Sequence, residues 1–151
     1  MKQQFLKTKV VEVEEMSRKE YIEKRGWVLL EDEKHLADER VFMVYYPDGY
    51  ISMCPKERFL EQAYGINNNK IPNELVVDFI KTKEITTERF AGKLMTVMRY
   101  ELENGFVGIE STSCVDEKNY REDIGKEILT KRLEEKIWFG LGFALGMAQS
   151  K

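Results

Sequence analysis

The run from Glu110 to Asp116, Glu-Ser-Thr-Ser-Cys-Val-Asp, combines residue types that bind anions or start a helix. It stands between a β-rich run and a helical pattern, so three hydroxyl groups are expected near the first backbone N–H groups of the helix. Helix N-termini attract anions such as phosphate. Ser113 or Asp116 could equally cap the helix without any ligand, and both interpretations stay open at this point.

The charges around this run bear on that choice. Glu110 and Asp116 repel a phosphate group, so a basic side chain has to offset them. The basic candidates are Arg99, Lys118, Arg121 and Lys126. Two carboxylates can also hydrolyse a glycosidic bond. However, the chain has 27 acidic residues, and chance pairs are therefore common. We assign Glu110 and Asp116 no catalytic role.

Other signs of catalysis are weak. His35, the only histidine, lies in a charged run without a neighbouring nucleophile, and a catalytic triad needs both groups in contact. Cys54 and Cys114 lack the paired spacing of a zinc module. Neither a Walker loop nor a dinucleotide-binding glycine pattern occurs. We therefore predict a binding protein and not an enzyme, with no catalytic residue, no metal site and no cofactor.

Composition narrows the class of partner. The 151 residues are 42% hydrophobic and 34% charged, which is typical of a folded protein, and the net charge is −3. Such a charge gives no general attraction to nucleic acid or to anionic lipid. The longest uncharged apolar stretch, Ile137 to Ala148, has about half of the ~20 residues that a membrane-spanning helix needs. We expect neither nucleic acid nor membrane as a partner.

The location is expected to be cytoplasmic. Two cysteines do not indicate a disulfide scaffold, and the first 15 residues lack the apolar run of a signal peptide.

We predict an α+β fold of two modules, residues 1–66 and 71–151, joined by the polar stretch Gly65 to Lys70. In the first module Ser17 and Glu20 form a capping box that starts a helix ending near Gly26. Residues 31–40 are expected to form a solvated loop. The remaining predicted elements are a strand over 7–13, two strands over 41–46 and 49–53, and a helix from Pro55 to about 64.

The second module is predicted to be a small antiparallel sheet with a β-hairpin, packed by a long C-terminal helix. Asn104-Gly105 favours a tight turn between strands over 94–102 and 106–114. Short helices are expected over 72–80 and 87–91.

After Asp116 apolar residues recur at steps of four or five, which indicates one face of the long helix. The predicted face contains Ile124, Ile128, Leu133, Ile137, Leu141 and Leu145. From Trp138 to Ala148 the helix is apolar all round, so this end must be covered by its own protein or by another copy. Gly142 and Gly146 would let a second backbone approach, and we favour a homo-oligomer formed through this helix.

Residues Leu102 to Leu145 resemble a widespread family of small phage proteins. The shared pattern has an Asn-Gly-Phe hairpin, a turn ending in Cys-Val-Asp, an Asn-aromatic pair, an Ile-Gly pair and a helix with Trp and a Gly-aromatic pair. In this chain the pattern falls on Asn104-Gly105-Phe106, Ser111 to Asp116, Asn119-Tyr120, Ile124-Gly125, Trp138 and Gly142-Phe143. Basic residues are common in the family after the Ile-Gly pair. Lys126 keeps the charge there but lacks the planar donor group of arginine. Leu141 stands where glutamate is usual. Residues 14–64 resemble a second common phage module without a secure activity.

The family is similar to the phage anti-Thoeris sponge proteins, which oligomerise and sequester cyclic ADP-ribose isomers, the signals of a bacterial TIR-domain defence system. The resemblance implies a phage-encoded binding protein in the cytoplasm of an infected or lysogenic host, which holds a cyclic nucleotide-type signal intact. Binding needs a cation for the pyrophosphate, an aromatic ring for the base, and hydroxyl or amide groups for the riboses. The predicted ligand-binding residues are Arg99, Phe106, Ser111, Ser113, Asn119 and Lys126. The alternative function is a phage adaptor that binds another protein.

Overall fold

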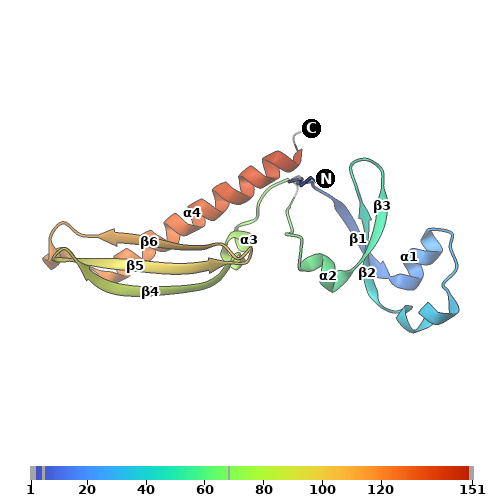
Figure 1. Cartoon of the computed structure of the whole chain (residues 1–151), viewed down its shortest axis with the longest axis horizontal. Coiled ribbons are helices and arrows are strands. Elements are labelled where there is room, and N and C mark those ends of the chain that lie inside the picture. Colours follow the sequence, from blue (N-terminus) through green and yellow to red (C-terminus); the bar gives the residue numbers. More distant parts are fainter. Residues whose placement is uncertain (1–2, 5, 68, 150–151) are drawn as a thin grey trace. The chain divides into compact units, whose positions relative to one another are not determined.

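The computed structural model describes residues 3–4, 6–67 and 69–149, and Figure 1 shows the elements along the chain. The chain divides into two compact units, Met1–Gly65 with Leu145–Lys151, and Ile66–Ala144. Each unit contains a three-stranded antiparallel sheet. Two such sheets and a long C-terminal helix confirm the predicted α+β class.

The first unit is built around the strand β2. Its elements are β1 (Glu12–Ser17), α1 (Arg18–Lys24), a 3-10 helix η1 (Glu31–Leu36), β2 (Arg40–Tyr45), β3 (Ile51–Pro55) and α2 (Lys56–Leu60). The strand order is β1-β2-β3, so β2 has a neighbour on both sides. Four successive residues of β2, 41–44, are buried, which shows that both faces of this strand are covered.

Two small clusters cover those faces. Val41 and Met43 pack with Met16 and Tyr21 in one apolar cluster. Phe42 contacts Phe59 of α2, with ring centroids 5.2 Å apart and an interplanar angle of 67°. The unit is therefore a compact structural module with apolar contacts on each side of its central strand.

Sequence predictions for this unit were right about the cap and wrong about the first strand. Ser17 accepts a hydrogen bond from the backbone N–H of Glu20, whose carboxylate accepts from the Ser17 N–H, so the capping box is confirmed. The first strand lies at Glu12–Ser17 and not at 7–13, because the six residues of β2 pair with these six. A 3-10 helix, η1, forms within the predicted loop 31–40.

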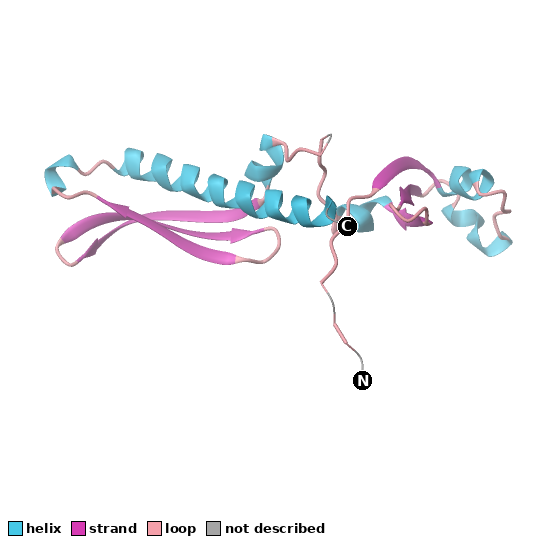
Figure 2. Cartoon of the chain, turned by 90° about the horizontal axis from the view of Figure 1, so that it is seen from above, coloured by secondary structure: helices cyan, strands magenta, loops and turns pink. Residues whose placement is uncertain are grey.

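The second unit is a sheet packed by a helix. Its elements are α3 (Asn73–Asp78), β4 (Ile80–Phe90), β5 (Lys93–Leu102), β6 (Val107–Ser113), a 3-10 helix η2 (Glu117–Asn119) and α4 (Glu122–Gln149). The strand β5 lies between β4 and β6. Figure 2 shows α4 running along the sheet. The predicted Asn104-Gly105 hairpin is confirmed, with Gly105 at a φ of 79°.

A second hairpin stands where a helix was predicted. Residues 87–90 belong to the eleven-residue strand β4, so the helix predicted over 87–91 is wrong. Ala91 and Gly92 form the two-residue turn to β5, with φ angles of 49° and 75°. Such a turn requires positive φ at both positions, which alanine rarely adopts. The sequence signal for this turn was therefore weak.

The buried face of α4 differs from the predicted one at its start. Gly125, Leu129, Leu133 and Ile137 are buried at four-residue steps. Leu133 and Ile137 were predicted correctly. The predicted positions 124 and 128 are 49% and 37% exposed. Periodicity counts apolar side chains and therefore overlooked a glycine as the first contact of the helix with the sheet.

Gly125 lets α4 approach the sheet closely at Thr96 of β5. A Cβ atom at position 125 would lie 2.1 Å from Thr96 Oγ1 and 2.8 Å from Thr96 Cβ. Thr96 is fully buried, and its Oγ1 lies 2.9 Å from the hydroxyl oxygen of Tyr120. Because Thr96 is enclosed and hydrogen-bonded, it has little room to move aside. A side chain at position 125 would therefore push the helix away from the sheet.

Figure 2 shows α4 along one face of this sheet, and the residues that alternate with Thr96 on β5 belong to the opposite face. Val97 points to this face, because side chains alternate along a strand and Thr96 faces α4. Val97 is nevertheless only 5% exposed. Arg99 hydrogen-bonds Thr86 (3.3 Å) and Glu88 (2.8 Å), which sit opposite Val97 and Met95 in the ladder. The Arg99 guanidinium group therefore lies back along the sheet, beside the β4 residues that pair with Val97 and Met95.

We predict that Gly125→Ala destabilises the protein. The overpacking against Thr96 costs about 1–3 kcal/mol, which exceeds the gain in helix propensity of about 1 kcal/mol. Thermal unfolding followed by circular dichroism should show a lower Tm. Gly140→Ala in the same helix is the matched control, because its Cβ meets nothing within 4 Å and only the propensity gain applies. A Tm for Gly125→Ala equal to or above that of Gly140→Ala would contradict the close contact.

Candidate functional site

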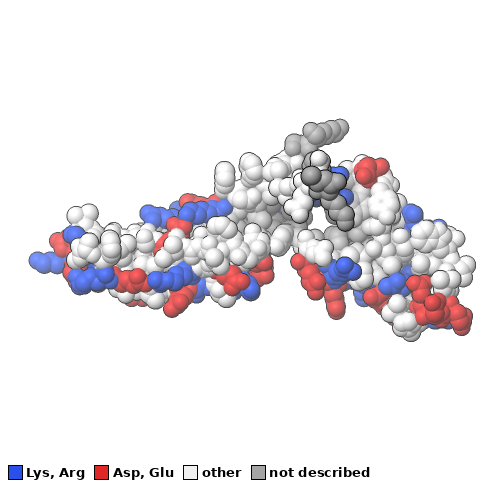
Figure 3. Space-filling view, viewed as in Figure 1, with Lys and Arg blue, Asp and Glu red and all other residues white. Residues whose placement is uncertain are grey.

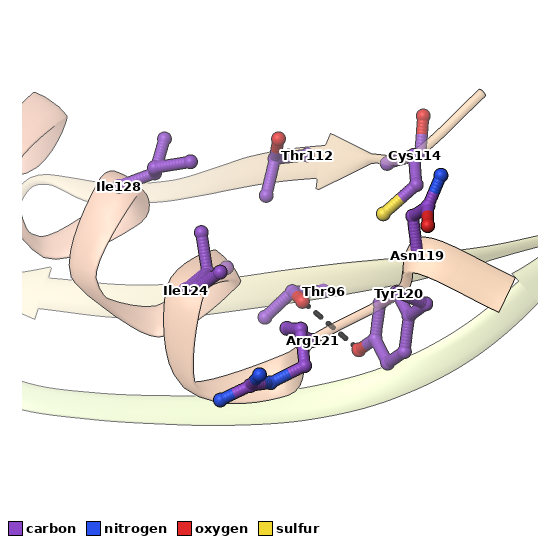
Figure 4. A pocket seen from close by; sticks show the side chains of 10 residues that line it. Thr96, Thr112, Cys114, Asn119, Tyr120, Arg121, Ile124 and Ile128 are labelled. Carbon is purple, nitrogen blue, oxygen red and sulfur yellow. Dashed lines mark hydrogen bonds between the residues drawn. The ribbon is translucent and has the colours of Figure 1, made fainter. Parts of the chain in front are cut away.

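A pocket lies between the helix-facing side of the sheet and the start of α4. Its volume is about 90 Å³, and it opens onto solvent. The residues that line it are Thr96, Thr112, Ser113, Cys114, Asn119, Tyr120, Arg121, Ile124, Gly125 and Ile128. Figure 4 shows the labelled side chains, which come from β5, from the end of β6, from the segment that leads into α4 and from the first turns of α4. This volume is below the range of about 300–1,000 Å³ that is typical of small-molecule sites, so the pocket can enclose only part of a nucleotide-sized ligand.

The segment that forms one wall is held by hydrogen bonds and ion pairs. The Asp116 carboxylate accepts from the backbone N–H of Lys118 and caps η2. Arg89 of β4 binds Glu117 through both terminal nitrogens, at 3.0 and 2.5 Å. The Lys93 ammonium donates to the Val115 carbonyl. These contacts join the β4–β5 turn to the segment after β6, and they fix the backbone that carries Asn119 and Tyr120.

Tyr120 provides an aromatic ring whose hydroxyl group is already engaged. Its hydroxyl oxygen lies 2.9 Å from Thr96 Oγ1 and 2.9 Å from Thr87 Oγ1, and the first of these contacts is dashed in Figure 4. Thr87 also donates to Glu122, at 2.8 Å. The ring is half-buried and is anchored at its tip to two strands.

Arg121 provides a cation at the edge of the pocket. Its guanidinium donates to both oxygens of Asp123, at 3.1 and 2.9 Å. The Arg121 guanidinium lowers the pKa of the Asp123 carboxyl below its ordinary value. Both side chains are about two-thirds exposed, at 65% and 66%. Exposed ion pairs contribute little to stability, so this arginine can change partner at small cost.

Two of the six predicted ligand residues line the pocket. Asn119 ends η2 and lies on its wall, and Ser113 borders it at the end of β6. Strand alternation points Thr112 and Cys114 towards the pocket and the Ser113 side chain the other way. Of the three consecutive hydroxyl residues predicted to face the helix start, Thr112 is the one on that side.

The other four predicted residues lie elsewhere. Arg99 and Ser111 point to the sheet face opposite α4, since they sit in line with Val97 in the ladder. Phe106 precedes β6 at its other end, roughly 23 Å from Ser113 at about 3.3 Å per residue. Lys126 lies on α4, where it forms an ion pair with Glu122 at 2.5 Å. The thickness or the length of the sheet thus separates Arg99, Ser111 and Phe106 from the pocket, and Lys126 is not among the residues that line it.

No ligand contact was predicted for Tyr120, Thr96 or Gly125. Two of the three stand in the motif pairs of the phage-family pattern, Asn119-Tyr120 and Ile124-Gly125. Those pairs were the signal that could have located the pocket. Thr96 lies in an ordinary β-rich run, and only the structure shows that it meets the helix start.

Within residues 3–4, 6–67 and 69–149, His, Cys, Asp and Glu do not gather in threes that could hold a metal ion. Cys54 and Cys114 are free thiols and half-buried. His35 is exposed on η1 of the first unit. No helix in the described part of the chain is long and apolar enough to cross a membrane.

The pocket lies within a region of the chain that matches a known protein family. Residues 66–148 match the phage protein family described as N4 Gp49/phage Sf6 gene 66. The chain belongs to this family. The residues that match the N4 Gp49/Sf6 gene 66 family include every residue that lines the pocket, whereas residues 1–65 lie outside the match. No curated protein and no solved structure matches the chain.

We predict that the contact between Arg89 and Glu117 weakens in acid. Arg89 holds the pKa of the Glu117 carboxyl below its ordinary value of 4.5. A carboxyl group whose pKa is lowered by folding stabilises the folded state above that ordinary value, and the contribution is lost as pH falls through the lowered pKa. NMR titration should place the Glu117 midpoint below 4.5, and Arg89→Met should raise it. An unchanged midpoint in Arg89→Met would show that the pair does not form in solution.

Proposed function

We propose that this member of the N4 Gp49/Sf6 gene 66 family sequesters an anionic, nucleotide-type signal of the cyclic ADP-ribose class in an infected bacterium and releases it unaltered. The observation that supports the proposal is one pocket that combines an aromatic ring, a cation, an amide and a hydroxyl group. These are Tyr120, Arg121, Asn119 and Thr112. The resemblance to anti-Thoeris sponge proteins points to the same class of ligand.

Each of these groups has a part in the proposed complex. The ring of Tyr120 stacks on the base. The hydrogen bonds of its hydroxyl group to Thr87 and Thr96 hold the ring in place. The Arg121 guanidinium leaves Asp123 and binds the pyrophosphate, for which its planar donor geometry is suited. The Asn119 amide and the Thr112 hydroxyl bind ribose hydroxyls. No bond of the ligand is broken in this scheme.

The contacts that hold the wall in place favour affinity. Binding is weakened when loops and side chains must be ordered by the ligand. Here Arg89, Lys93 and Asp116 already hold the segment that carries the binding residues. A pocket fixed before the ligand arrives retains more of the interaction free energy as affinity.

Retention of an intact probe tests the proposal. We expect cyclic ADP-ribose, mixed with the purified protein, to be depleted from the filtrate in ultrafiltration. Heat denaturation should then return it with unchanged mass, as measured by mass spectrometry. A cleaved product would indicate an enzyme, and a filtrate with the full amount of probe would refute binding of this compound.

Two substitutions at one ion pair should act in opposite directions. Arg121→Ala should weaken probe binding by about tenfold or more, because a charge-assisted hydrogen bond contributes about 1.5–3 kcal/mol. Asp123→Asn should tighten it several-fold, because it releases Arg121 from its present partner. Lys131→Ala is the matched control for charge, since Lys131 is exposed on α4 outside the pocket. Equal effects of Arg121→Ala and Lys131→Ala would show that only overall charge matters.

The apolar end of α4 favours a second candidate function, binding of another protein chain. Phe139 and Phe143 are 76% and 63% exposed, and their rings stack at 6.3 Å between centroids. Figure 3 shows uncharged side chains along the part of α4 beyond its middle, while charges of both signs cover the sheet. Large exposed apolar residues are usual at protein interfaces. We propose that a second copy of the chain covers them.

Native mass spectrometry tests self-association and also distinguishes sequestration from an adaptor function. A homo-oligomer that retains a nucleotide-mass ligand supports sequestration, and Phe139→Glu with Phe143→Glu should reduce the oligomer to monomer. A stoichiometric complex with a different protein, purified from infected cells without a small molecule, would instead identify an adaptor.

A further inference from the structure

The hydroxyl group of Tyr120 belongs to a chain of hydrogen bonds that ends on a carboxylate. Thr96 Oγ1, Tyr120 OH and Thr87 Oγ1 follow one another at 2.9 Å, and Thr87 Oγ1 lies 2.8 Å from the Glu122 carboxylate. The four residues come from β5, the turn before α4, β4 and the first residue of α4. The chain therefore connects two strands with the helix start across the wall of the pocket.

The carboxylate determines the direction of every hydrogen bond in this chain. An ionised carboxylate only accepts hydrogen bonds, and each hydroxyl group has one proton to donate. Thr87 must therefore donate to Glu122. Tyr120 must then donate to Thr87, and Thr96 must donate to Tyr120. A single arrangement of protons satisfies all three contacts, so the tyrosine hydroxyl both donates and accepts.

Lys126 holds the carboxylate in place. Its ammonium lies 2.5 Å from Glu122 Oε1, one turn along α4. The other oxygen, Oε2, accepts from Thr87. Glu122 is therefore bound on both oxygens, by a cation from its own helix and by a hydroxyl group from the sheet. Lys126, which was predicted as a ligand contact, has Glu122 as its ion-pair partner in this structure.

We infer that Glu122 is a positioning residue for the pocket: through Thr87 it fixes the hydroxyl group of Tyr120, and thereby the ring that stacks on the ligand. Neither Glu122 nor Thr87 lines the pocket. Their influence on a ligand has to pass through Tyr120. The effect of Glu122 on ligand affinity rests on the proposed function, whereas its effect on the Tyr120 ring does not.

NMR of the ligand-free protein tests whether Glu122 and Thr87 hold the hydroxyl group of Tyr120. Tyrosine labelled with ¹³C at Cζ reports hydrogen bonding of its hydroxyl group. Tyr120→Phe identifies the Tyr120 signal among those of the seven tyrosines. Glu122→Ala and Thr87→Val should both shift this signal. Glu122→Gln should preserve it, because the amide oxygen still accepts from Thr87. Glu127→Ala, at an exposed carboxylate of the same helix, should leave it unchanged.

Affinity for cyclic ADP-ribose is the second measurement. Glu122→Ala should weaken probe binding by about tenfold, and Glu122→Gln should restore it to within about threefold of the original chain. An unshifted Tyr120 signal in Glu122→Ala would overturn the inference. So would a Glu122→Gln variant that behaves like Glu122→Ala, since the ion pair with Lys126 would then be the cause. If the unmodified protein does not bind the probe, the proposed function fails, and the Tyr120 signal still decides the role of Glu122.

Discussion

At the contact between α4 and β5, a hydrogen atom of Gly125 stands where any other residue would place a carbon 2.1 Å from Thr96. The depth at which the helix lies on the sheet depends on this contact. The buried residues that follow on α4, Leu129, Leu133 and Ile137, continue the same line of contact. The contact also brings Tyr120, five residues earlier, within hydrogen-bonding distance of Thr96. The pocket is thus a consequence of how closely the helix packs.

The sequence predicted correctly those elements that a few adjacent residues specify. The Ser17-Glu20 cap and the Asn104-Gly105 turn were both found as predicted, since each is specified by a few adjacent side chains. The β4–β5 turn was missed because Ala91 adopts a positive φ that its own side chain disfavours. There the pairing of two long strands outweighs the preference of one residue.

The site was harder to predict, because it depends on register and on a residue without a side chain. Arg99 and Ser111 have suitable chemistry, but strand alternation points them away from α4. Asn119 was predicted for its amide group, and Tyr120 beside it was noted only as part of a motif. A single sequence does not show which β5 residue faces the helix start. Thr96 could therefore be recognised only from the contact with Gly125.

The partners of Arg99 limit what this sheet face can do. Arg99 donates to Thr86 and Glu88, and Val97, which strand alternation points to the same face, is 5% exposed. An anion at this face would have to compete with the Glu88 carboxylate for the guanidinium group. The face therefore carries a cation that already has an acceptor within its own sheet.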